Sequence, residues 1–198
     1  MNARRGFALA AALAGTACLW QGAWIHLKAD LAQVLIAHAW QRHERGDAKA
    51  RPWPWADTTP VARLVVPGVT EHVYYVLEGA SGRNLAFGPA HDPASVLPGE
   101  PGNSVISGHR DTAFRFLEGL VAGDRLRVDR NGTSTWFTVT DARVVDSRFK
   151  RIALASDAPR LTLVTCYPFA ALVPGGPLRW VVTASAEDSR RSLAAGAP

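Results

Sequence analysis

The sequence of 198 residues contains very little cysteine: two residues, of which only Cys166 lies outside the first twenty positions. Cys18 lies inside an apolar run, so Cys166 has no disulfide partner in the rest of the chain, and a disulfide framework is excluded. Zinc-finger spacing of cysteine and histidine is absent, and so are internal repeats. The chain must therefore fold around its hydrophobic residues, which make up 47% of it.

The middle of the chain also has little net charge. The formal net charge is +5, but residues 61–186 contain 13 Lys and Arg against 11 Asp and Glu. The aromatic and basic pattern typical of RNA-binding modules is missing, so we expect no nucleic-acid partner. The basic segment 147–159, SRFKRIALASDAP, has no cluster of carboxylates. The sequence therefore predicts no calcium or other metal site and no cofactor.

One apolar run is long enough to cross a membrane. Residues 6–25, GFALAAALAGTACLWQGAWI, carry no charge and follow Arg4 and Arg5, and about 20 apolar residues span a bilayer as a helix. The two arginines favour a cytoplasmic N-terminus. We predict an uncleaved signal anchor over residues 1–27, with the remainder outside the cytoplasm. A cleaved signal peptide and a lipoprotein site at Cys18 are the alternatives, although no clear cleavage motif ends the run.

Residues 28–60 are predicted to form a stalk helix followed by a linker. Apolar residues recur at helical spacing as far as Ala39, which predicts an amphipathic helix ending near Arg45. Prolines 52, 54 and 60 then favour an extended path. Because indole rings seek burial, we expect Trp53 and Trp55 to pack on the domain that follows.

Residues 61–186 consist mainly of short segments with the composition of β-strands. These are VARLVV (61–66), EHVYYVLE (71–78), NSVIS (103–107), RLRVD (125–129), TSTWFTVTDARVV (133–145), RLTLVT (160–165) and LRWVVTAS (178–185). Asn131 and Gly132 predict a hairpin turn, and short helical pieces are expected around 93–97 and 113–117. Many short strands favour a closed or sandwich-like β domain. Residues 187–198 are predicted to be a flexible tail.

Three residues with useful chemistry lie at strand ends. Cys166 follows the strand 160–165, and Pro168 prevents that strand from continuing. His109 follows a strand and a glycine, and Arg179 begins the strand after the cysteine. Taken singly, Cys166 is either a buried structural residue or a reactive thiol, His109 a turn residue and Arg179 a solvated rim charge. If the strands starting at 160 and 178 are neighbours, Arg179 lies close to Cys166.

The motifs SGHRDTAF, TLVTC and PLRWVV, in this order, resemble the His, Cys and Arg motifs of sortases, and RPWPWADTTPVARL resembles the Gram-negative, marine proteobacterial subgroup. The resemblance implies a mainly β fold, a closed eight-stranded sortase-type barrel with short helices over residues 61–186, after the N-terminal transmembrane and stalk helix. It also implies that Cys166 is the nucleophile and that His109 and Arg179 are the essential histidine and arginine. Thr165 matches a position associated with substrate binding.

The same resemblance implies the reaction and its place. A sortase cleaves an LPXTG-like sorting signal of a secreted protein between Thr and Gly through a thioester, then transfers the protein to an amine at the cell envelope. The chain would then be a single-pass protein of the inner membrane with a periplasmic catalytic domain. Phe149, Ile152 and Leu154 either line a groove for the signal or belong to the core. Asp111 either orients His109 or Arg110 or caps a short helix.

Two alternatives to a transpeptidase stay open on the sequence. The first is an envelope cysteine peptidase that only hydrolyses the thioester. The second is a non-catalytic adhesion or scaffold module in which Cys166 is buried. An L,D-transpeptidase is disfavoured, because that family has an arginine two residues beyond its cysteine, where this chain has Pro168.

Overall fold

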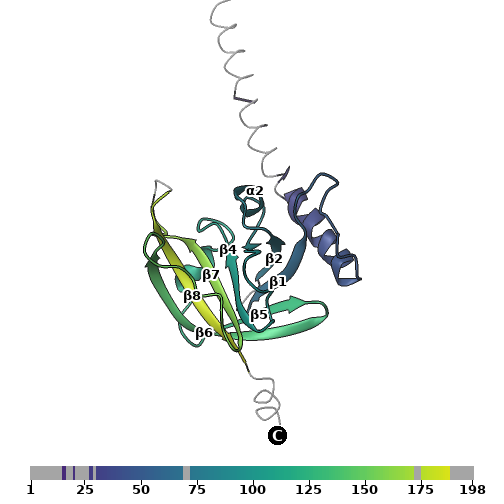
Figure 1. Ribbon diagram of the computed structural model, residues 1–198. Coiled ribbons are helices and arrows are strands. Elements are labelled where there is room, and N and C mark those ends of the chain that lie inside the picture. Colours follow the sequence, from purple (N-terminus) through teal and green to yellow (C-terminus); the bar gives the residue numbers. More distant parts are fainter. Residues whose placement is uncertain are drawn as a thin grey trace, which may run out of the picture.

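The β-strands of the protein close into a barrel, as the computed structural model shows for residues 15, 16, 20, 27, 28, 30–68, 72–171 and 175–187 (Figure 1). The strand order around the barrel is β1-β2-β3-β4-β7-β8-β6-β5. Most neighbours are antiparallel, but β2 pairs in parallel with β3, and β4 in parallel with β7. The prediction of a mainly β, closed eight-stranded barrel with short helices is therefore confirmed.

The elements follow the sequence pattern closely. The strands are β1 (Pro60–Val66), β2 (His72–Glu78), β3 (Ala90–His91), β4 (Gly102–Ser107), β5 (Arg125–Arg130), β6 (Thr133–Asp146), β7 (Pro159–Cys166) and β8 (Leu178–Ala186). A helix covers 30–44, and the barrel also carries α2 (Gly82–Leu85) and the 3₁₀ helix η1 (Arg115–Gly119). The elements β3 and α2 were not predicted, because two and four residues are too short to show a period.

The prediction of a short helix around 93–97 is wrong, since this segment forms turns. The carboxylate of Asp92 accepts a hydrogen bond from the backbone N–H of Ala94, and such side-chain contacts compete with helix formation. The piece expected around 113–117 is present as η1, shifted by two residues. Asn131 and Gly132 have φ angles of 50° and 71°, so the predicted hairpin turn between β5 and β6 is confirmed.

The helix over 30–44 lies against the barrel beside β1, β2 and α2 (Figure 1). Its side chain Ile36 is 1% exposed and packs with Leu77 and Ala90 of the barrel. Both carboxylate oxygens of Glu44 accept backbone hydrogen bonds from the turn at Asn131 and Gly132. This helix is therefore part of the folded domain rather than a free stalk.

The two linker tryptophans differ. Trp53 packs edge-on against Phe87 with ring centroids 5.0 Å apart, as expected. Trp55 is 80% exposed, so the expectation of its packing is wrong. The backbone N–H of Ala56 donates to the carbonyl of Trp53, and this tight turn directs the side chain of Trp55 outward.

None of the helices in the described part of the chain is long and apolar enough to span a membrane. The predicted anchor over residues 1–27 falls mostly outside the described residues, and so does the predicted tail after residue 187.

Replacing Ile36 by alanine tests whether the helix over 30–44 stabilises the barrel. We expect Ile36→Ala to lower the free energy of unfolding by about 2–5 kcal/mol, because a buried side chain is removed and a cavity remains. Val34 lies on the same helix but is 61% exposed, so Val34→Ala should stay within about 0.5 kcal/mol of the wild type. Urea denaturation measures both, and equal effects would contradict the packing described here.

Candidate active site

The registers of three adjacent strands bring the predicted residues to one end of the barrel. In the parallel pair, Ser107 of β4 lies opposite Val164 of β7. Continuing this register by two residues sets His109 level with Cys166. In the antiparallel pair, Cys166 lies directly opposite Arg179 of β8. The structure therefore brings all three residues to neighbouring strand ends at the same rim.

The turn that carries His109 is tied to β7 by two hydrogen bonds. The backbone N–H of Gly108 donates to the carbonyl of Val164 at 3.1 Å, which extends the ladder beyond β4. The hydroxyl of Thr165 donates to the carbonyl of Gly108 at 2.7 Å. Thr165 is only 2% exposed. Its side chain thus fixes the backbone before His109, and its role in substrate binding stays a prediction.

Gly108 is required by close packing. A Cβ atom there would lie 2.6 Å from Cγ of Phe114, whose ring is fully buried. The backbone N–H of Phe114 donates to the carbonyl of His109 at 2.9 Å and closes the turn. His109 itself is exposed, so its imidazole is accessible at the rim.

Arg110 is a positioning residue that the sequence did not reveal. It is 7% exposed, and its guanidinium donates to the carbonyl of Pro168 at 2.6 Å and to the carbonyl of Ala171. Its Nε lies 3.3 Å from a carboxylate oxygen of Asp111. Asp111 therefore pairs with Arg110, and η1 has Phe114 at its N-cap without a side-chain cap. Arg110 holds the chain after Cys166 against the turn of His109.

Cys166 is a free, half-buried thiol. The residues after it are fixed by aromatic contacts, since Tyr167 stacks on Trp180 with ring centroids 5.9 Å apart. Arg179 is also half-buried, and its Nη1 donates to the carbonyls of Gly176 at 2.6 Å and Leu178 at 2.8 Å. One guanidinium nitrogen thus anchors the side chain beside Cys166, and the planar fork can present its other N–H groups to a bound carbonyl.

A cavity of about 190 Å³ lies on the same face of the sheet. It is enclosed by β6, β7, β8 and the segment 147–158, and it is lined by Asn103, Arg143, Val145, Lys150, Arg151, Ile152, Ala153, Arg160, Thr162, Val181 and Thr183. Ile152 lines this cavity, and its role in holding the sorting signal stays a prediction. Phe149 is 80% exposed and Leu154 39% exposed, and neither belongs to this lining or to the core.

Asn103 attaches the segment 147–158 to the barrel, which the sequence did not reveal either. This side chain of β4 is 2% exposed and donates to the carbonyl of Ala153 at 2.7 Å. Its backbone N–H donates to the carbonyl of Leu154 at 2.9 Å. Its carboxamide oxygen accepts from the hydroxyl of Thr162 at 2.8 Å. One residue therefore fixes both the β4–β7 pairing and one wall of the cavity.

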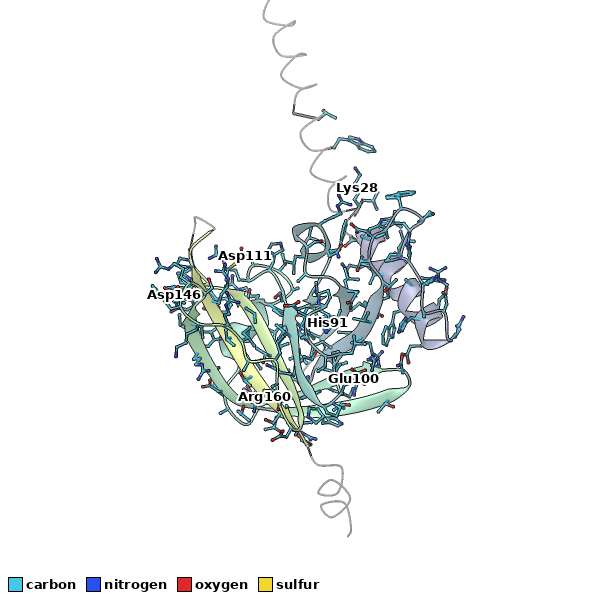
Figure 2. All side chains as sticks on the ribbon, in the orientation of Figure 1. Lys28, His91, Glu100, Asp111, Asp146 and Arg160 are labelled. Atoms are coloured by element: carbon cyan, nitrogen blue, oxygen red, sulfur yellow. The ribbon has the colours of Figure 1, made fainter. Side chains whose placement is uncertain are left out.

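Across the described ranges, no group of three or more His, Cys, Asp or Glu side chains is arranged to hold a metal ion. Figure 2 shows Asp111 and Asp146 toward one end of the barrel, and Arg160 near the other end of β7. On β7 the cavity is lined only by Arg160 and Thr162, in the half of the strand away from Cys166, but on β6 it includes Val145, the register partner of Arg179.

Residues 64–187 match the family profile of the Sortase domain, which is more than half of the chain. The chain belongs to the sortase family. Sortases are cysteine transpeptidases, and His109, Cys166 and Arg179 all lie within the matched residues, while their catalytic roles stay predictions.

Known sortases resemble the chain in both sequence and fold. Sortase D of Bacillus subtilis (strain 168) is 34% identical over 108 residues, which are 54% of each chain, so this chain spans about half the length of that curated relative. The crystal structure of sortase C-1 from Actinomyces oris is 28% identical, with a TM-score of 0.58 over 65% of this chain and 73% of that one. Sortase A from Corynebacterium diphtheriae is 21% identical, covers 79% of this chain and 84% of its own, and has a TM-score of 0.59, which shows the shared fold.

Replacing Gly108 by alanine tests the packing that positions His109. We expect Gly108→Ala to destabilise the fold by about 1–3 kcal/mol, because the new methyl group would displace the buried ring of Phe114. Gly119 has no atom within 4 Å of a built Cβ, so Gly119→Ala is the matched control and should leave the thermal unfolding temperature nearly unchanged. An unaltered unfolding temperature for Gly108→Ala would refute this packing requirement.

Proposed function

We propose that this sortase is a transpeptidase that cleaves an LPXTG-like sorting signal between Thr and Gly and transfers the protein to an amine. The observation that supports the proposal is the register of β4, β7 and β8, in which Cys166 lies opposite Arg179 and level with His109. A thioester mechanism needs a nucleophile, a proton carrier and a stabiliser of the oxyanion. These three residue types supply them at one rim.

In the first half of the proposed reaction, the thiolate of Cys166 attacks the carbonyl carbon of the threonine. The guanidinium of Arg179 donates charge-assisted hydrogen bonds to the carbonyl oxygen as negative charge develops on it. His109, protonated, gives its proton to the departing glycine nitrogen. The carbon–nitrogen bond breaks, and the donor remains attached to Cys166 as a thioester.

In the second half, an amine attacks the thioester carbon. His109, now neutral, accepts a proton from the amine, and the thiolate of Cys166 leaves as the new amide bond forms. The exposure of His109 and the half-buried position of Cys166 support this step, because an acceptor must reach both from solvent. A water molecule in place of the amine would give the hydrolytic peptidase.

We further propose that the chain belongs to the Gram-negative subgroup and acts in the periplasm, held by a single-pass anchor in the inner membrane. The run RPWPWADTTPVARL and the uncharged residues 6–25 after Arg4 and Arg5 support this assignment. Membrane fractionation with added protease tests it. We expect the protein in the inner membrane, with its domain digested only after the outer membrane is opened; recovery in the soluble fraction would refute the anchor.

A peptide assay tests the transpeptidase reaction. We expect the protein to cleave an LPXTG peptide at the Thr–Gly bond and to form an amide with added triglycine in an amount that rises with its concentration. Cys166→Ala should abolish both products, because no thioester can form. Cys18→Ala removes the other cysteine and should keep the activity, which makes it the matched control.

The products separate this function from its alternatives. Free acid as the sole product at every triglycine concentration would indicate a peptidase. No turnover, together with protection of Cys166 from an alkylating probe in the folded protein, would indicate a non-catalytic module.

A further inference from the structure

Positive charge converges on the cavity beside the proposed active site. Arg143 extends from β6, Lys150 and Arg151 from the segment 147–158, and Arg160 from β7, and all four side chains line the cavity. Asp and Glu are absent from its lining. Concave sites lined by charge of one sign focus the electrostatic field more strongly than the same charges on a flat surface.

Within the described residues, most of this charge is not neutralised. Arg143 lies 3.2 Å from a carboxylate oxygen of Asp141, so its charge is partly offset. Lys150, Arg151 and Arg160 make no ion pair with any residue that the structure describes. Arg160 is half-buried, which reduces solvent screening of its charge.

The carboxylates that flank the segment 147–158 or lie within it do not compensate for the other three cations. Asp146 lies 2.7 Å from Arg148, whose hydrogen bonds hold the pKa of Asp146 below its ordinary value. Asp157 is exposed in the same segment but does not line the cavity. A negatively charged group on a ligand could therefore neutralise the cations that line the cavity.

The position of the cavity fits the donor peptide. On β8 its lining includes Val181 and Thr183, two and four residues beyond Arg179. An extended peptide advances roughly 3.3–3.6 Å per residue, much as a strand does. Because the lining also includes Val145, the register partner of Arg179, a side chain that enters the cavity would lie about one to three residues from the residue whose carbonyl is bound between Cys166 and Arg179. Such a side chain belongs to the second to fourth residue before the cleaved bond.

We propose that this cavity binds an acidic side chain of the sorting signal, about two to four residues before the cleaved bond. The proposal rests on the proposed function, since the cleaved bond defines the position. A donor suits the cavity better than the acceptor does, because a protonated amine would be repelled by its cations. The apolar walls at Val145, Ile152 and Val181 suit the methylene stem of Asp or Glu better than a bare inorganic anion.

Peptides in matched acid and amide pairs test the proposal. LPETG is compared with LPQTG, and DPQTG with NPQTG, so each pair differs only by the charge at the second or fourth residue before the cleaved bond. We expect the acidic member of at least one pair to have a kcat/KM about five- to tenfold higher than its amide at low ionic strength. The difference should shrink at about 0.5 M salt, where exposed charges are screened.

Charge reversal identifies the cavity as the cause. Arg151→Glu lies in the exposed segment and Arg160→Glu in β7, so the first variant remains informative if the second fails to fold. Either should remove the preference for the acidic peptide and favour the corresponding lysine peptide. Arg45→Glu is the control, because this exposed arginine follows the helix over 30–44 and is absent from the cavity lining.

A binding assay keeps this proposal separate from the proposed function. The Cys166→Ala variant cannot turn over, and fluorescence anisotropy of labelled peptides gives its affinities directly. Tighter binding of the acidic peptide, lost in the Arg151→Glu background, supports the acid site even if no peptide is cleaved. Equal binding and equal kcat/KM for both members of both pairs would overturn it, even if the uncharged peptides are processed.

Discussion

The parallel pairing of β4 with β7 is the contact on which the candidate site depends. β7 ends at Cys166 and β4 ends two residues before His109, and a slip of one residue would turn every side chain of the strand to the other face. Two side-chain hydrogen bonds resist such a slip, from Thr162 to Asn103 at 2.8 Å and from Thr165 to the carbonyl of Gly108 at 2.7 Å. Both donors are almost fully buried, so losing either bond would leave an unpaired buried polar group.

The strand β4 and the residues just after it also hold the two segments on either side of the site. Asn103, near the start of β4, fixes the segment 147–158 through two backbone carbonyls. Arg110, just beyond the end of β4, fixes the chain after Cys166 through two others. Segments without regular structure become precise binding surfaces when a rigid scaffold positions them. Here one strand supplies that positioning for both, which couples the geometry of the thiol to that of the cavity.

Local pattern was enough to predict much of this arrangement. Alternation and turn residues predicted the longer strands, and strand ends with a cysteine, a histidine and an arginine predicted the candidate site. Arg110 and Asn103 could not be found in this way, because their partners are backbone carbonyls, which every residue has, many positions away in the sequence. Trp55 was mispredicted for a related reason. Its apolar indole ring favoured burial, but a local turn directs the side chain outward.

The sequence shows that the segment 147–159 is basic, but it does not show that these cations gather around one cavity with cations from other strands. The cavity gains Arg143 and Arg160 only because β6 and β7 flank that segment in the barrel. Its lining begins at Val145 of β6, the register partner of Arg179, and extends along β8 to Thr183. Solvent-exposed charges are screened over about 8–10 Å at physiological salt. Register partners on antiparallel strands lie about 5 Å apart, so the cavity begins within this distance of Arg179, and in the proposed enzyme its cations would act on the carbonyl oxygen through their field as well as favour donor binding. Arg179 would contact that oxygen directly, whereas the cavity arginines would act on it only through their field, so substrate selection and transition-state stabilisation would be electrostatically coupled on one face of the sheet.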